Sequence, residues 1–287
     1  MMPSLPDPSR VADALRALRN ARSSDAALPF IDAALHALES PRTPGLGGPA
    51  PTPDLSPADL AAFLDHTQLR PAATSTDIGA VCDEAREHGF ATVCIPPNAV
   101  PHATERLADT DVGVCTVVGF PHGTSRSTVK AYEAARAVGD GADEVDMVLP
   151  IGLLKEGRVA AVASDVRAVV DAVHTATDDG CVKVILETAL LTDAEVAVAC
   201  VAVERAGADF VKTSTGFASA GATLPHVALM RQMVGDALGV KAAGGVGSAA
   251  DALQMIAHGA TRIGASGSVS IVTDAAPASA SSSASPY

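Results

Sequence analysis

Aromatic residues and long apolar runs are both scarce in this chain of 287 residues. Aromatics make up 3% of it and tryptophan is absent, whereas hydrophobic residues reach 48%, so aliphatic side chains must fill the core. The longest apolar run falls far short of the roughly 18 residues that a membrane-spanning helix needs. The N-terminus also lacks the apolar region of a signal peptide. We therefore expect a cytoplasmic protein with no membrane partner.

Positive charge and paired cysteines are scarce as well. The net charge of −13 disfavours nucleic acid as a partner, and any anionic substrate would need a locally electropositive pocket. The five cysteines are odd in number, include no CxxC pair, and lie mostly in apolar stretches, where cysteine behaves as a small hydrophobe. The sequence therefore predicts reduced thiols, with neither zinc nor disulfides.

Composition divides the chain into three parts. Residues 1–57 hold two amphipathic helical patterns followed by a linker rich in proline and glycine. Residues 58–272 form the ordered body, and residues 273–287 form a low-complexity tail that we expect to be flexible. The extension could pack on the body or mediate oligomerisation, and the sequence does not decide between these roles.

The ordered body alternates short apolar segments with helical patterns. Candidate strands lie at 64–67, 91–95, 112–119, 144–149, 182–187, 209–214, 240–243 and 262–265. Several helical patterns end at a glycine shortly before a strand, namely at Gly89, Gly141, Gly207 and Gly259. This alternation predicts parallel βαβ units, and eight strands at this spacing suit a (β/α)8 TIM barrel. The alternative is an open doubly wound sheet, although no GxGxxG motif follows the first strand.

Lysine is rare here, yet it occurs where strands are expected. Three of the five lysines, Lys183, Lys212 and Lys241, lie in the apolar segments "CVKVILET", "DFVKTSTG" and "GVKAAGG". Lysine is seldom fully buried unless it is paired or used in chemistry. If strand order follows the sequence, strands four to seven direct these lysines and Asp146 into one space.

A cluster of this kind suits Schiff-base chemistry. Desolvation and a nearby ammonium group both lower the pKa of a lysine, and a neutral amine can attack a carbonyl to form an imine. The imine then withdraws electrons during carbon–carbon cleavage, for which Asp146 is a candidate proton shuttle. The alternative is that the lysines form buried salt bridges with Asp146 and Glu187.

Glycine-rich loops follow the last three expected strands, with the sequences "STG", "GGVGS" and "GASGS". Backbone N–H groups in such loops bind phosphate, and the loops after strands seven and eight are the usual phosphate site of TIM barrels. A phosphate could therefore be held without additional basic side chains, which suits an acidic chain.

Seven segments spread over residues 60–270 together resemble the deoxyribose-phosphate aldolase family: "LDHTQL", "GFPHG", "GADEVDMVL", "VKVILET", "FVKTSTGF", "VKAAGGV" and "GASGS". The resemblance implies a class I lyase, with no metal and no other cofactor, that reversibly cleaves 2-deoxy-D-ribose 5-phosphate to D-glyceraldehyde 3-phosphate and acetaldehyde. It implies Lys212 as the Schiff-base lysine, Lys241 as the lysine that perturbs it, and Asp146 as the acid/base carboxylate. Substrate or phosphate contacts are expected for Thr215, Gly216, Gly244, Gly245, Gly264, Ser266 and Lys183.

The chain departs from the family pattern at three positions. Gly247 stands where relatives often have arginine or lysine, Gly267 where many have a second serine, and Pro96 where relatives often have asparagine or tyrosine. These differences bear on phosphate affinity and substrate shape more than on aldol chemistry.

The last residue of the chain is Tyr287. Some members of the resembled family also end in a mobile tail with a terminal tyrosine, which implies that Tyr287 can enter the site and move a proton. The alternative is a solvated tail without a role. Four other residues have plainer interpretations. Asp65 and His66 could bind substrate, but structural hydrogen bonds at the bottom or rim of the barrel are favoured. His122 is a turn residue, and Cys94 is a buried thiol, with a position facing the pocket as the alternative.

Two other functions remain open from the sequence. One is a transaldolase-like Schiff-base barrel that acts on a different sugar phosphate, and the other is a barrel that binds phosphate ligands without turnover. The expected partners are a small sugar phosphate and an aldehyde, together with a second copy of the chain in a homodimer.

Overall fold

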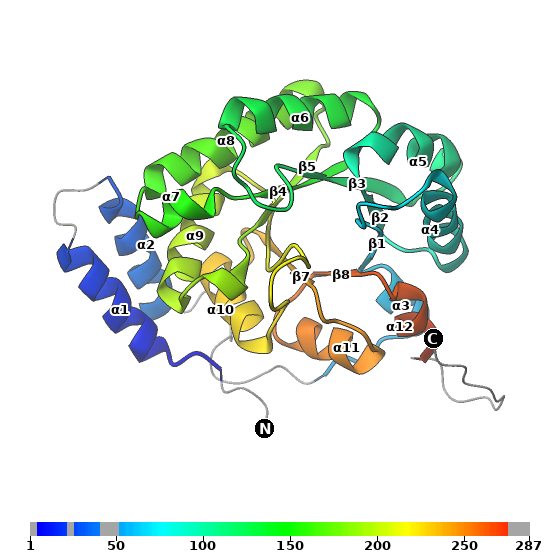
Figure 1. The fold of residues 1–287 in the computed structure, drawn as a ribbon. Helices are drawn as coiled ribbons and strands as arrows, with labels where there is room; N and C mark the ends of the chain where they lie inside the picture. The colour runs from blue at the N-terminus through cyan, green and yellow to red at the C-terminus, as the bar shows by residue number, and fades with distance from the viewer. Residues whose placement is uncertain (1–4, 22–25, 41–51, 275–287) are drawn as a thin grey trace.

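The structure, a computed structural model, describes residues 5–21, 26–40 and 52–274 (Figure 1). Eight parallel strands close into a barrel in sequence order, which confirms the predicted (β/α)8 fold and excludes the open sheet. The strands are β1 (Leu64–Thr67), β2 (Thr92–Ile95), β3 (Gly113–Val118), β4 (Glu144–Val148), β5 (Cys181–Ile185), β6 (Phe210–Lys212), β7 (Gly239–Ala243) and β8 (Arg262–Ala265).

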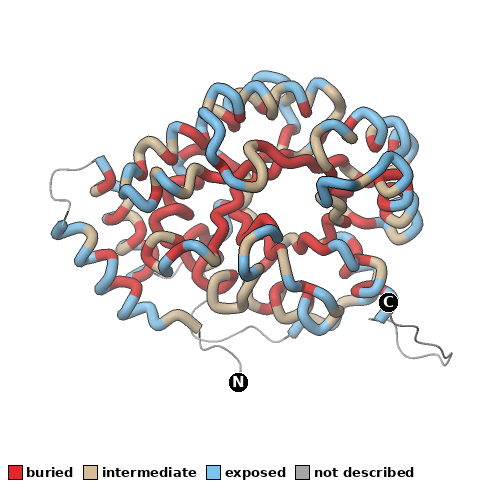
Figure 2. The backbone as a smooth tube through the Cα atoms, viewed as in Figure 1, coloured by how far each residue is buried: buried red, intermediate tan, exposed pale blue. Residues whose placement is uncertain are grey.

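Helices surround the barrel on its outside (Figure 1). They are α4 (Ser75–His88), α5 (Val100–Leu107), α6 (Ser127–Gly139), α7 (Ile151–Lys155), α8 (Val159–Ala176), α9 (Asp193–Ala206), α10 (Leu224–Val234), α11 (Ala249–Ala257) and α12 (Ser268–Asp274), with single 3-10 turns η1 (Pro97–Ala99) and η2 (Thr188–Leu190). Figure 2 shows buried residues along the strands and the inward faces of the helices. The apolar core is therefore a layer between sheet and helices, filled mainly by valine, alanine and leucine.

Local sequence signals set the ends of several of these helices. Gly89 and Gly207 end α4 and α9 with φ of 67° and 83°, values that favour glycine because it has no Cβ. Thr74 and Ser248 begin α4 and α11 with capping boxes, in which side chain and backbone at the helix start bond each other. Defined ends keep the loops short, so each helix returns the chain to the next strand.

The N-terminal extension packs on the barrel. Its helices α1 (Pro8–Ala21) and α2 (Leu28–Glu39) lie against α9, and α2 also contacts α10. The Gln232 side chain donates a hydrogen bond to the carbonyl of Ala37 at 3.0 Å, and the Arg205 guanidinium lies 5.1 Å from the centre of the Phe30 ring. The domain boundaries at 57 and 272 stay predictions. Residues 41–51 of the linker and residues 275–287 of the tail lie outside the described residues.

A short helix, α3 (Pro57–Ala61), leads into β1 and packs against α12. Its start is held by a capping box between Ser56 and Asp59. In the part of the chain that the structure describes, every helix is too short or too polar to cross a membrane.

Candidate active site

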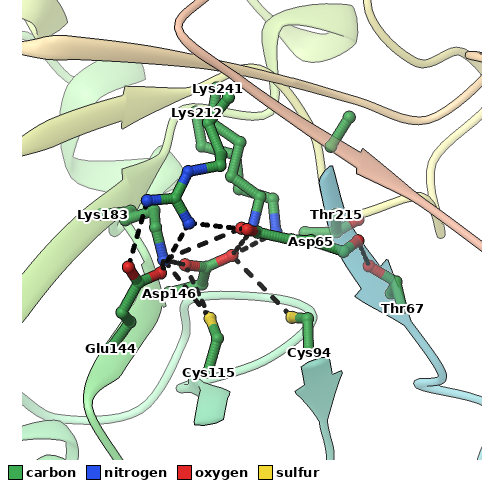
Figure 3. Close-up of polar contacts among 12 residues, drawn as sticks. Asp65, Thr67, Cys94, Cys115, Glu144, Asp146, Lys183, Lys212, Thr215 and Lys241 are labelled. Atoms are coloured by element: carbon green, nitrogen blue, oxygen red, sulfur yellow. Dashed lines mark hydrogen bonds and ion pairs between the residues drawn. The ribbon is translucent and has the colours of Figure 1, made fainter. Parts of the chain in front are cut away.

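A network of charged side chains fills part of the barrel interior (Figure 3). Its carboxylates are Asp65 from β1 and Glu144 and Asp146 from β4, and its cations are Lys183, Lys212, Lys241 and Arg262 from β5 to β8. The strand register accounts for this meeting, because Asp146 is level with Lys183, and Lys212 is level with Lys241. Three carboxylates thus face four cations, so one cation has no carboxylate of its own.

Asp146 is the centre of the network. Its Oδ2 lies 2.6 Å from the Lys212 amine and 2.7 Å from the Lys241 amine, and its Oδ1 accepts a hydrogen bond from Lys183 at 2.9 Å. Burial alone would raise the pKa of Asp146, but the three lysines outweigh burial and hold that pKa well below its ordinary value. Asp146 is therefore an ionised carboxylate that touches every lysine of the cluster.

Lys241 is a fixed cation beside Lys212. It is fully buried and pairs with both Asp146 and Asp65. Burial would lower the pKa of Lys241, but the two carboxylates raise it well above the ordinary value. Gly264 makes room for this side chain, because a Cβ there would come within 3.1 Å of the Lys241 Cε.

Lys212 is the member of the cluster that a substrate can reach. It lines a cavity of about 830 Å³ at the carboxyl ends of the strands. Of the lysines in residues 52–274, Lys212 alone lies in the wall of this cavity. Its side chain is 3% exposed, so the amine is desolvated yet accessible from one side.

The glycine-rich loops form another part of the same wall. All six residues that the sequence predicts there line the cavity: Thr215, Gly216, Gly244, Gly245, Gly264 and Ser266. Gly216, Gly244 and Gly245 have φ of 87°, 82° and 80°, a backbone region that side chains disfavour. At these three positions the cavity is lined by backbone alone, because glycine has no side chain.

Lys183 lies apart from this wall. It is fully buried and pairs with Glu144 and Asp146, and its amine lies 3.4 Å from the Cys115 sulfur. Burial would lower the pKa of Lys183, but these neighbours, led by Asp146, raise it well above the ordinary value. The expectation that Lys183 contacts a phosphate finds no support in this position.

Glu187 does not pair with the lysines, so the alternative that made it their partner is wrong. Strand β5 ends at Ile185, and Glu187 turns away with φ of 57°. Its carboxylate instead accepts hydrogen bonds from the backbone N–H, at 3.2 Å, and the hydroxyl of Thr215. Glu187 therefore supports the loop after β6.

Sequence reasoning gave Asp65 a structural role but overlooked its partner Arg262. Asp65 lies inside the barrel near the start of β1 and bonds Lys241 and, at 2.7 Å, Arg262, the first residue of β8. Arg262 also bonds Glu144 at 3.2 Å. The available signal was strand alternation, which places Asp65 on one face of β1, but only closure of β1 on β8 shows what that face meets.

The sequence also pointed to four further residues, three of which the structure describes. His66 pairs with Glu84 at 2.6 Å and lines the cavity, and His122 is exposed in the loop after β3. Cys94 is a buried thiol, as expected, with its sulfur 4.0 Å from Asp146 Oδ2. Tyr287 lies outside the described residues, so its role stays a prediction.

Among the described residues, two sets of atoms in the barrel could ligate a metal ion. One is Asp65, Cys115 and Glu144, whose two carboxylates already pair with lysines. The other is Cys94, Cys115 and Asp146, which offer ligand atoms that lie within 4.8 Å of one another. The oxygens of Asp146 already bond three lysine amines, so a metal cation would have to displace ammonium groups. The donor set therefore fits proton chemistry better than metal binding.

Comparison with known proteins gives a consistent family. Residues 60–271 match the sequence model of the DeoC/LacD family aldolases. A deoxyribose-phosphate aldolase of Streptococcus pneumoniae serotype 19F is 54% identical over 213 residues, which cover 74% of this chain and 95% of that protein.

Solved structures that resemble this chain include aldolases of the same kind. A deoxyribose phosphate aldolase of Aeropyrum pernix, described as a tetramer, has 34% identity and a TM-score of 0.71, covering 76% of this chain and 92% of its own. A candidate deoxyribose-phosphate aldolase of Coccidioides immitis has 40% identity and a TM-score of 0.78, covering 88% and 98%. With its barrel, its lysine cluster and these matches, the chain belongs to the DeoC/LacD family of aldolases.

Proposed function

We propose that this chain is a class I aldolase that reversibly cleaves 2-deoxy-D-ribose 5-phosphate to D-glyceraldehyde 3-phosphate and acetaldehyde, a step in deoxyribonucleoside breakdown. One observation carries the proposal: the Lys212 amine lines the cavity and lies 2.6 Å from Asp146, which also bonds Lys241. We infer the substrate from the names of the relatives, which are deoxyribose-phosphate aldolases.

The first step is attack of the Lys212 amine on C1 of the open-chain sugar, with loss of water to give an imine. The attacking amine must be neutral. Because the network holds four cations against three carboxylates, loss of one proton leaves it balanced. Lys212 is the lysine at the cavity, so its proton is the one whose loss opens the reaction.

Cleavage then breaks the C2–C3 bond. Asp146, directly or through a water molecule, accepts the proton of the C3 hydroxyl, and the electron pair of the bond moves toward the iminium nitrogen. This releases D-glyceraldehyde 3-phosphate and leaves an enamine on Lys212. Protonation of the enamine at C2 and hydrolysis release acetaldehyde. Lys241 bonds Asp146 at 2.7 Å and can return the proton, and Tyr287 is a second candidate donor.

The glycine-rich loops would bind the phosphate group. Their glycines leave backbone amides uncovered at the cavity wall, and amides bind phosphate without adding net charge. This suits a chain with a net charge of −13. We also propose a homodimer in the cytoplasm, with the sugar phosphate and the aldehyde as small-molecule partners.

A product assay tests this function. The purified chain is incubated with 2-deoxy-D-ribose 5-phosphate, and acetaldehyde and D-glyceraldehyde 3-phosphate are measured separately, with Lys212→Arg as the control. We expect both products in equal amounts from the wild type and neither from the variant. Cleavage of other sugar phosphates without acetaldehyde would favour the transaldolase-like alternative, and binding without products would favour a non-catalytic barrel.

A further inference from the structure

The wall of the active-site cavity contains one cation that the mechanism does not use. Among the residues that line the cavity, Lys212 and Arg70 are the lysine and arginine members. Lys212 becomes neutral when it forms the imine. The loop after β7 supplies no cationic side chain, because Gly247 follows the glycines of the wall. Arg70 therefore remains as the permanent positive charge at this surface.

Barrel closure brings Arg70 close to the loops at the far end of the chain. Arg70 lies in the loop after β1, and β1 pairs with β8 so that Asp65 is level with Gly264 and His66 with Ala265. The segments that follow β1 and β8 therefore leave the sheet side by side, at Thr67 and Ser266. The loop that carries Arg70 thus borders the loop after β8, and both face the same cavity.

The guanidinium of Arg70 is held in place but not fully used. Its Nε and its backbone N–H both donate to the Gln68 side chain, at 3.1 and 3.2 Å, and the Gln68 backbone bonds the carbonyl of Cys94 at 2.9 Å. Within residues 52–274, the two terminal nitrogens of Arg70 have no hydrogen-bond partner. A planar guanidinium with free N–H groups suits bidentate binding of phosphate.

The acidic residues of the cavity already have partners. On α4, Asp77 accepts hydrogen bonds from Thr74, and Glu84 pairs with His66 at 2.6 Å. Arg70 is close enough to Asp77 to contribute to the lowered pKa of that carboxyl, after the larger effect of the Thr74 hydrogen bonds. These pairings leave the exposed guanidinium of Arg70 free to bind an anion in the cavity.

We propose that Arg70 binds the phosphate group of the substrate from the β1 side of the cavity and thereby sets the preference for phosphorylated over unphosphorylated sugars. This inference rests on the proposed function for its substrate. A phosphate between the loops after β8 and β1 receives backbone amides from one side and a guanidinium from the other.

The test compares Arg70→Gln with two other variants. For Arg70→Gln we expect kcat/KM for 2-deoxy-D-ribose 5-phosphate to fall about tenfold or more, mainly through KM, because a charge-assisted hydrogen bond is lost. The kcat/KM for unphosphorylated 2-deoxy-D-ribose should not change. Arg70→Lys should retain most of the preference. Arg86→Gln is the matched control, since Arg86 pairs with Asp109 at 2.6 Å away from the cavity.

Binding of inorganic phosphate is a second test, and it does not depend on enzyme turnover. Its dissociation constant, followed by thermal shift, should rise about tenfold in Arg70→Gln and stay unchanged in Arg86→Gln. Unchanged phosphate binding, or equal losses on both sugars, would overturn the role of Arg70. A wild type that binds phosphate through Arg70 but releases no acetaldehyde would instead overturn the proposed function and leave this inference standing.

Discussion

Two substitutions at the centre of the network should have opposite effects on stability. The barrel interior holds three carboxylates and four cations. Asp146→Asn leaves two carboxylates against four cations, whereas Lys212→Met leaves three against three. The first change exposes three ammonium groups to one another without their shared partner. The second removes one cation and leaves Asp146 paired with Lys183 and Lys241.

The expected magnitudes differ clearly. Removing one partner of a buried ion pair costs about 3–5 kcal/mol, and Asp146 is fully buried with three lysine partners. At about 2–4 °C per kcal/mol for a domain of this size, the melting temperature of Asp146→Asn should fall by roughly 6–20 °C. For Lys212→Met we expect an unchanged or higher free energy of unfolding, as is common when an active-site strain is relieved.

Urea unfolding followed by circular dichroism measures both variants beside the wild type. Asp109→Asn is a suitable control because it breaks an exposed ion pair with Arg86, which should cost less than about 1 kcal/mol. Both central variants should lose turnover, but Asp146→Asn should still form some imine, since its nucleophile is intact. If Lys212→Met destabilises the chain as much as Asp146→Asn does, the balance of carboxylates and cations in the network does not determine stability.

Three further predictions follow from the same site. Lys241→Leu removes the neighbouring cation, so imine formation near neutral pH should slow and the pH–rate profile should move to higher pH; an unmoved profile would make Lys241 a structural partner only. Tyr287→Phe should lower turnover at least tenfold and slow deuterium exchange into the methyl group of bound acetaldehyde, while borohydride trapping on Lys212 persists; wild-type rates would make the tail a bystander. The pKa values of Asp65 and Asp146 are lowered in the folded chain, so the unfolded chain binds more protons in acid, and the stability that these groups contribute should be lost as pH falls below about 4. Equal urea midpoints at pH 6 and pH 3 would contradict this assignment.

Local sequence patterns were enough to predict the barrel and half of the site. Apolar segments that alternate with helical patterns ending at glycine specify βαβ units, and consecutive strands lie side by side in such a fold. Lys183, Lys212 and Lys241 could therefore be placed together with Asp146 before the structure was known. The glycine-rich loops were predictable for the same reason, since they follow neighbouring strands.

The sequence did not predict contacts that depend on closure of the barrel or on where a strand ends. Asp65 and Arg262 meet because β1 pairs with β8, and no local pattern relates positions so far apart in the chain. Arg70 was overlooked for the same reason. Glu187 was misplaced because strand alternation holds only within a strand, and β5 ends before it.

Trapping of the imine tests the central claim most directly. The chain is treated with borohydride in the presence of acetaldehyde, digested, and mapped by mass spectrometry. Reduction should leave an ethyl group on the peptide that contains Lys212, and Lys212→Arg should show no adduct while its circular dichroism spectrum is retained. An adduct on Lys183 or Lys241 instead, or no adduct on the wild type, would contradict the assignment of Lys212 as the Schiff-base lysine.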